Sequence, residues 1–138
     1  MRGRLFFIFV VIFSLLASTG SAQNQQKPAE APKIIAIKFH ADWCGFCKAM
    51  GSTFEELQAK FDTLPVLYLV LDHTREYNRK QSAYLAYALD LADVWAEFGG
   101  KTGFILLINA KTKQVVTKLT HQQSLKEMGA LLVEAVKK

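Results

Sequence analysis

Three nearly continuous hydrophobic runs stand out in the chain, over residues 33–41, 64–72 and 104–109. Runs of this length that are rich in isoleucine, leucine and valine predict buried strands, because both faces of such a strand contact other elements. A fourth segment, residues 114–119, follows the turn "AKTK" and alternates well between hydrophobic and polar side chains. This alternation predicts a strand that pairs antiparallel with the run before it.

The segment after the first run has hydrophobic side chains three or four positions apart, which predicts one face of an amphipathic helix. Gly51 and the adjacent Ser52 and Thr53 interrupt this segment near its middle, so a bend is expected there. The hydrophobic positions of the segment are Phe46, Met50, Phe54, Leu57 and Phe61.

Two further helices are predicted nearer the C-terminus. Residues 81–98 again show helical spacing, and the glycine pair that follows ends the helix. Residues 124–138 form the last helix, where Ser124 is placed to cap the first turn with Glu127 three residues further on. The hydrophobic positions of the first of these helices are Tyr84, Ala88, Leu91, Trp95 and Phe98.

The predicted order of elements is β-α-β-α-β-β-α over residues 33–138. Strands that are separated by helices are expected to pair in parallel through crossovers, and the final hairpin adds an antiparallel strand. We therefore predict a single α/β domain in which a four-stranded mixed sheet is flanked by helices on both faces.

Residues 1–22 have the pattern of a secretory signal peptide. A short basic start precedes an uncharged hydrophobic run over residues 5–17, and small residues follow it. Cleavage is expected after Ala22, which would place the protein in the periplasm or outside the cell. The alternative is an uncleaved membrane anchor, although the run is shorter than the roughly 20 residues that a spanning helix needs. Residues 23–32 are polar with two prolines and predict a flexible leader.

Charge and cysteine content narrow the classes of function. The formal net charge is +5 at pH 7, but the lysines are scattered, so no nucleic-acid partner is predicted. A membrane is expected to be contacted only through the signal peptide. Both cysteines, Cys44 and Cys47, lie in the stretch "WCGFCK". A disulfide between them would close a very short loop and add little stability, which disfavours a purely structural bridge.

The cysteine pair lies where the first predicted strand ends and a helix begins. The free amides and the positive dipole end of that helix stabilise a thiolate at Cys44. Cys47, one turn into the helix, is near enough to attack a mixed disulfide formed at Cys44. This arrangement predicts a redox pair that needs no cofactor. The alternative is a soft-metal site in which Cys44, Cys47 and His40 bind copper or zinc.

The stretch "KFHADWCGFCKAM", residues 38–50, resembles the active-site segment of the thioredoxin superfamily. The element order is similar to that fold without its first strand and helix. The resemblance implies a thiol–disulfide oxidoreductase that exchanges disulfides with protein substrates. The role that is common in this superfamily favours a reductase over an oxidase. It implies that Cys44 attacks, that Cys47 resolves and that Trp43 flanks the substrate groove. It also implies a membrane protein that donates or accepts electrons.

Three positions depart from the pattern of the superfamily. Thr102 stands where a cis-proline normally faces the cysteines, so its peptide bond is either a costly cis bond or an ordinary trans bond. Lys38 stands where many members have a buried acid, and it either faces solvent or is buried with a lowered pKa. His40, where an aromatic residue is common, either tunes the thiolate or is a structural histidine at the strand end.

The connection over residues 72–98 is longer than in thioredoxins, and it carries the additional aromatic residues Tyr77, Tyr84 and Tyr87. Two interpretations of this connection remain open. It is either an elongated core helix or a docking surface for a partner, since exposed tyrosines are effective interface anchors. A third class of function, a non-catalytic thioredoxin-like binding module, is disfavoured because both cysteines are present.

Overall fold

The computed structural model describes residues 30–138, so the predicted signal peptide and most of the predicted leader lie outside the described residues. Within this range the predicted α/β class and the mixed four-stranded sheet are confirmed. The elements are β1 (Ile34–His40), α1 (Gly45–Met50), α2 (Thr53–Lys60), β2 (Val66–Asp72), α3 (Glu76–Ala88), α4 (Ala92–Phe98), β3 (Phe104–Asn109), β4 (Val115–Thr120) and α5 (Leu125–Lys137).

The sheet has the strand order β2-β1-β3-β4, in which β1 pairs parallel with β2 but antiparallel with β3. The expectation of parallel pairing between all helix-separated strands is therefore wrong for β3. The connection between β2 and β3 contains two helices, and it leaves from and returns to the same end of the sheet, where β1 also ends. His73 and Gly103, at its two ends, donate backbone hydrogen bonds to His40 and Phe39 at the end of β1.

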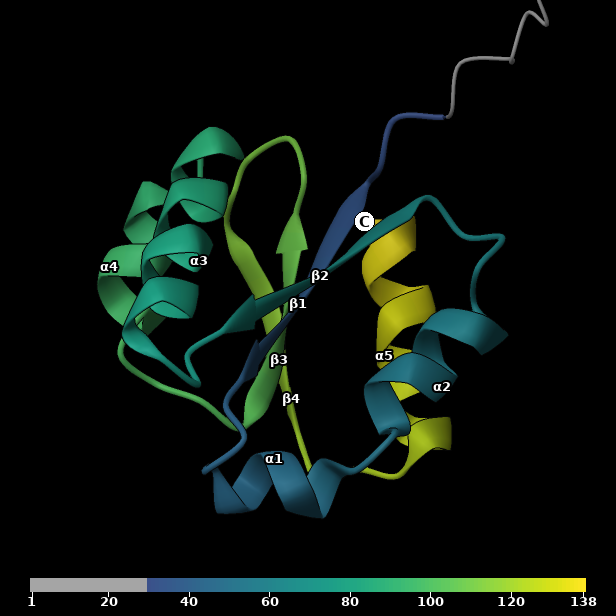
Figure 1. The fold of residues 1–138 in the computed structure, drawn as a ribbon. Coiled ribbons are helices and arrows are strands. Elements are labelled where there is room, and N and C mark those ends of the chain that lie inside the picture. The colour runs from purple at the N-terminus through teal and green to yellow at the C-terminus, as the bar shows by residue number, and fades with distance from the viewer. Residues whose placement is uncertain (1–29) are drawn as a thin grey trace, which may run out of the picture.

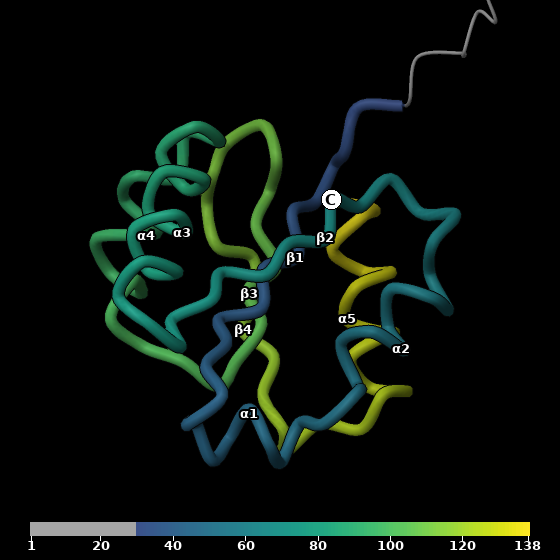
Figure 2. The backbone as a smooth tube through the Cα atoms, in the orientation of Figure 1, coloured from purple at the N-terminus to yellow at the C-terminus, as the bar shows by residue number. Residues whose placement is uncertain are grey.

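Two hydrophobic layers lie on the two faces of the sheet. Helices α2 and α5 cover one face, and α3 and α4 cover the other, as Figure 1 shows. The central strands β1 and β3 contribute fully buried side chains to both layers. Helix α1 lies across one end of the sheet, at the bottom of Figure 2, close to the segments that precede β3 and follow β4. The sheet therefore holds α1 and these two segments close together at this end.

The predicted bend and cap are both confirmed. Gly51 has a positive φ of 53° and separates α1 from α2, so the interrupted helical segment becomes two helices. A positive φ is readily adopted by glycine, which has no Cβ. At the start of α5, the Ser124 side chain accepts a hydrogen bond from the Glu127 amide, and the Glu127 side chain accepts one from the Ser124 amide.

The helix predicted over residues 81–98 differs from the structure in its limits and in its buried face. It starts earlier, as α3, and the chain turns at Asp90, which has a φ of 64°, before α4 begins. Because the turn changes the direction of the helix, one continuous spacing cannot describe both parts. Ser82 and Ala86 are the buried positions of α3, whereas the predicted core position Tyr84 is 77% exposed.

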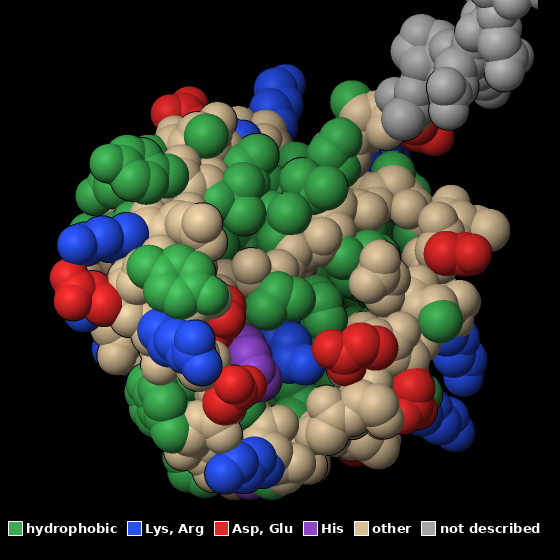
Figure 3. Space-filling model, viewed as in Figure 1, with side chains coloured by type: hydrophobic (Ala, Val, Ile, Leu, Met, Phe, Trp, Pro, Cys, Tyr) green, Lys and Arg blue, Asp and Glu red, His purple; other side chains and the backbone are tan. Residues whose placement is uncertain are grey.

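All three tyrosines of α3 are exposed, and so is Val70 on the edge strand β2. Figure 3 shows hydrophobic side chains at the surface on this side of the molecule. Helix α3 thus packs its small residues against the sheet and turns its large aromatic residues outward. This exposure is what a docking surface requires, and such a role for α3 stays a prediction. In the part of the chain that the structure describes, none of the helices has the length and hydrophobicity to cross a bilayer.

His73 is the buried titratable group of the layer beneath α3 and α4. Its ring stacks against Phe39 and Trp95, with ring centroids 6.1 and 5.3 Å apart. Burial lowers the pKa of His73, and the positive charge of Arg79 lowers it further, while the negative charge of Asp72 opposes the change. The folded protein therefore favours the neutral imidazole.

We predict that the protein loses stability below about pH 6.5 because of His73. Since its pKa is lower in the folded state, the unfolded chain binds the proton first as the pH falls, and protonation favours unfolding. Replacing His73 with Phe should flatten the pH dependence of the free energy of unfolding between pH 7 and 5. Urea unfolding at several pH values measures this. An equal decrease in both proteins would show that other groups cause it.

Candidate active site

The two cysteines lie at the start of α1, as the sequence predicts. Cys44 is the N-cap residue of this helix, and its sulfur accepts a hydrogen bond from the Cys47 amide at 3.2 Å. The Cys44 amide donates to the Ala41 carbonyl, which fixes the turn between β1 and the helix. Both thiols are free, and together with Ala41 they form a small buried cluster. The sulfur of Cys44 therefore takes the position that a capping oxygen occupies in other helices.

The environment of Cys44 favours its thiolate. Burial raises the pKa of Cys44, but hydrogen bonds to its sulfur from the side chains of Cys47 and Thr102 and from the amides of Cys47 and Phe46 outweigh burial. The net result is a pKa below the ordinary value of a cysteine. Hydrogen bonds to the charged form of a group have this effect in general.

The environment of Cys47 favours its protonated thiol. Burial raises the pKa of Cys47, and the hydrogen bond and negative charge of Cys44 raise it further. The Cys47 sulfur is 3.6 Å from the Phe39 carbonyl oxygen, to which the thiol donates. The pair is therefore asymmetric, with one reactive sulfur and one sulfur that keeps its proton.

The loop before β3 packs directly against the cysteines. Gly103 has a φ of 93°, and its amide donates to the Phe39 carbonyl at 2.9 Å. A Cβ at this position would lie 2.6 Å from the Phe46 Cβ and 3.2 Å from the Cys44 sulfur, so glycine alone fits here. No cis peptide bond occurs among residues 30–138, which settles the alternative at Thr102 in favour of a trans bond. The Thr102 side chain is still one of the groups that lower the pKa of Cys44.

Trp43 lies on the other side of the pair and is 63% exposed. Its indole nitrogen donates to the Thr74 carbonyl at 3.2 Å, and the Asp42 amide donates to the Thr74 hydroxyl. The loop after β2 therefore holds the exposed indole beside the cysteines, where a substrate can contact it. Sequence reasoning missed Thr74, because nothing in the pattern indicates that this loop meets the one after β1.

His40 pairs with Asp42, with 3.1 Å between its Nε2 and the carboxylate. The groups that hydrogen-bond to the Cys44 sulfur do not include it. In the described part of the chain, no three His, Cys, Asp or Glu side chains are close enough together to bind a metal ion. His40 therefore does not complete a ligand set with Cys44 and Cys47, contrary to the metal-site alternative.

Lys38 is buried, with 6% of its surface exposed, so the solvent-facing alternative is wrong. Its Nζ lies 2.8 Å from a carboxylate oxygen of Glu55 on α2 and 5.6 Å from the centre of the Phe54 ring. Burial raises the pKa of Glu55, but the hydrogen bond and charge of Lys38 outweigh this and leave the pKa below its ordinary value. Because the ammonium group of Lys38 already has a carboxylate partner, it does not act as a base towards Cys47.

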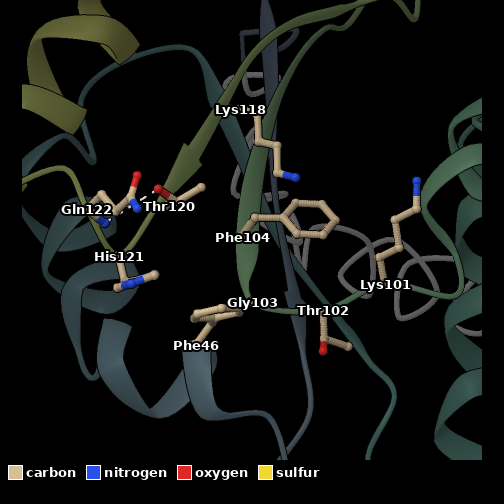
Figure 4. Close-up of a pocket in the computed structure, with 9 residues that line it drawn as sticks. All are labelled: Phe46, Lys101, Thr102, Gly103, Phe104, Lys118, Thr120, His121 and Gln122. Carbon is tan, nitrogen blue, oxygen red and sulfur yellow. Dashed lines mark hydrogen bonds between the residues drawn. The ribbon is translucent and has the colours of Figure 1, made fainter.

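A groove of about 290 Å³ lies next to the cysteines, between α1, the loop before β3 and strand β4 (Figure 4). His121 forms one wall, where its ring stacks on Phe46 with centroids 4.9 Å apart. Sequence reasoning missed most of these residues, because three distant segments contribute them. The lining residues are Phe46, Lys101, Thr102, Gly103, Phe104, Lys118, Thr120, His121 and Gln122.

Comparisons with known sequences agree with the geometry of the site. The sequence model of the thioredoxin family matches residues 17–85, which is half of the chain. A thioredoxin H-type from Picea mariana is 29% identical over 65 residues, covering 47% of this chain and 52% of the relative. Thioredoxin-1 from Drosophila yakuba is 39% identical over 54 residues, covering 38% and 50%. The chain thus spans about half the length of these two curated relatives.

Comparisons with solved structures agree with the fold. A thiol:disulfide interchange protein of the thioredoxin family from Chlorobium tepidum superposes with a TM-score of 0.51 at 16% identity, covering 75% of this chain and 80% of that chain. Tryparedoxin from Trypanosoma brucei superposes with a TM-score of 0.50 at 14% identity, covering 72% and 76%. At such low identity these similarities concern the fold alone.

We predict that replacing Thr102 with Val raises the pKa of Cys44. The change removes the hydroxyl that helps to lower the pKa of Cys44 and keeps the shape of the side chain, so the thiolate loses one stabilising interaction. Titration of the ultraviolet absorbance of the thiolate measures the pKa. Thr63→Val, in the exposed loop before β2, is the control and should leave the titration unchanged. Identical titrations of both variants would exclude a contribution from Thr102.

Proposed function

Because this chain belongs to the thioredoxin family, we propose that it is a thiol–disulfide oxidoreductase in which Cys44 is the nucleophile and Cys47 the resolving cysteine. The observation that carries this proposal is the asymmetry of the pair. The Cys44 sulfur accepts a hydrogen bond from the Cys47 amide at 3.2 Å, whereas the Cys47 thiol donates one to the Phe39 carbonyl at 3.6 Å. The pKa of Cys44 is lowered and that of Cys47 is raised, in agreement with this difference. A structural bridge has no need of such a difference, whereas two-step exchange does.

In the first step, the Cys44 thiolate attacks one sulfur of a substrate disulfide. A mixed disulfide forms, and the other substrate sulfur leaves as a thiolate. In the second step, the Cys47 thiol gives up its proton to the solvent or to the leaving thiolate and attacks the Cys44 sulfur. The second substrate sulfur leaves, the Cys44–Cys47 disulfide forms, and the substrate gains two electrons. A dithiol protein then returns two electrons to the pair.

The proposed direction of the reaction is reduction of substrates. A strong oxidant has a highly stabilised reduced form, because its thiolate is held by strong favourable interactions. Here burial opposes the thiolate of Cys44, and hydrogen bonds from neutral groups are what lower its pKa. This moderate stabilisation supports a reductase.

The proposed location is outside the cytoplasm, on the strength of the signal-peptide pattern over residues 1–22. In that compartment protein disulfides persist and are available as substrates. A reductase there needs electrons from the cytoplasmic side, so we propose a membrane-bound dithiol protein as the electron donor.

We predict that the purified protein reduces insulin disulfides and that Cys44→Ser lowers this activity to the uncatalysed rate, since the attacking sulfur is lost. Cys47→Ser should perform the first step alone and accumulate mixed disulfides at Cys44. Mass spectrometry of non-reduced samples measures these adducts, and a dithiol should release them. Adducts that form equally well in Cys44→Ser, or insulin reduction that survives in it, would refute the assigned roles.

We also predict that the Cys44–Cys47 pair is a reducing couple. Equilibration with mixtures of reduced and oxidised glutathione should give a potential nearer to the roughly −270 mV of thioredoxins than to the roughly −120 mV of strong oxidants, because neutral donors rather than a positive charge stabilise the thiolate. Trapping of free thiols with an alkylating reagent measures the equilibrium. A potential near that of the strong oxidants would reverse the proposed direction.

A further inference from the structure

The groove beside Cys44 carries two lysines above a hydrophobic floor. Phe104 forms the floor and is 3% exposed, and the Lys118 ammonium lies 4.3 Å from the centre of its ring. The Lys101 ammonium lies 5.2 Å from the centre of the Phe98 ring. Figure 4 shows both lysine side chains beside Phe104. Each ring attracts the ammonium group above it through a cation–π interaction, which favours these side-chain positions.

The positive charge of this groove is not neutralised within the described residues. None of its lining side chains is a carboxylate, and neither lysine takes part in an ion pair among residues 30–138. The carboxylates on the Trp43 side of the cysteines already have partners. Asp42 pairs with His40, and Asp72 accepts hydrogen bonds from Thr74 and other groups. Within the groove itself, the two lysines are therefore the charges that a ligand would meet.

The groove is also continuous with the reactive sulfur. Gly103 lines the groove and approaches the Cys44 sulfur so closely that a Cβ on it would be 3.2 Å away. Thr102, another lining residue, is one of the groups that lower the pKa of Cys44. A substrate whose cysteine is joined to Cys44 can therefore place its neighbouring residues along this groove.

We propose that this groove selects disulfide substrates with acidic residues next to the reacting cysteine. A carboxylate there would meet Lys101 and Lys118, while the rest of the segment would lie on Phe46 and Phe104. The occupant is an extended acidic peptide segment, chosen by charge complementarity. The proposal rests on the proposed oxidoreductase function and names the substrate class of the same site.

Three disulfide-linked peptides that differ only in the residues flanking the cysteine test this proposal. The flanking residues are glutamate, glutamine or lysine, and the measured quantity is the rate constant for reduction by the protein. The glutamate peptide should react about fivefold faster than the glutamine peptide, as expected for exposed ion pairs, and the lysine peptide should be slowest. Salt should reduce the differences, because it screens exposed charges.

Substitutions that change the charge of the protein show whether the preference among peptides comes from the groove or from the overall charge. Lys101→Gln with Lys118→Gln should bring the ratio of glutamate to glutamine rates close to one, and Lys101→Glu with Lys118→Glu should favour the lysine peptide. Lys60→Gln with Lys111→Gln, on α2 and in the turn after β3, removes the same charge elsewhere and should keep the ratio. Circular dichroism confirms that each variant is folded.

The outcomes distinguish the acidic specificity of the groove from the oxidoreductase function on which it rests. Equal rates for all three peptides, or equal ratios in all variants, would refute the acidic specificity and leave the oxidoreductase function intact. No reduction of any peptide by the unaltered protein would refute the function itself. Faster reduction of oxidised glutathione than of the glutamate peptide would assign the groove to a small disulfide and overturn the peptide proposal.

Discussion

The hydrogen bond from the Cys47 amide to the Cys44 sulfur caps helix α1 and also stabilises the reactive sulfur. Every helix begins with amides that lack a partner, and here a sulfur rather than an oxygen satisfies one of them. The bond becomes stronger when the sulfur is charged, because charge-assisted hydrogen bonds are stronger than neutral ones. Capping of α1 and stabilisation of the Cys44 thiolate are thus one interaction, which requires the helix to begin at this residue.

A single carbonyl group near the end of β1 holds two further parts of the site. The Phe39 oxygen accepts from the Gly103 amide at 2.9 Å and from the Cys47 thiol at 3.6 Å. It therefore fixes the loop before β3 and the buried cysteine to the same point. Phe39 itself is fully buried between α3, α4 and the sheet, so this point is as rigid as the core.

The sequence correctly predicted those features of the fold that depend on interactions between neighbouring residues. The position of Cys44 at a strand-to-helix junction, the break at Gly51 and the capping box at Ser124 each depend on a few consecutive residues. The antiparallel direction of β3 depends on how two helices return the chain to the end of the sheet where β2 stops, and no local pattern contains that. The burial of Lys38 likewise depends on Glu55, seventeen residues away on another element.

The charges around the site divide into two groups with separate effects. The positive charge of Lys38 is satisfied by Glu55, and the interactions that lower the pKa of Cys44 are hydrogen bonds from neutral donors. Salt screens exposed charges strongly but affects buried hydrogen bonds little. The pKa of Cys44 should therefore depend less on ionic strength than the encounter with a charged substrate through Lys101 and Lys118. The same protein can then change its substrate preference with ionic conditions while the hydrogen bonds around its redox pair are kept.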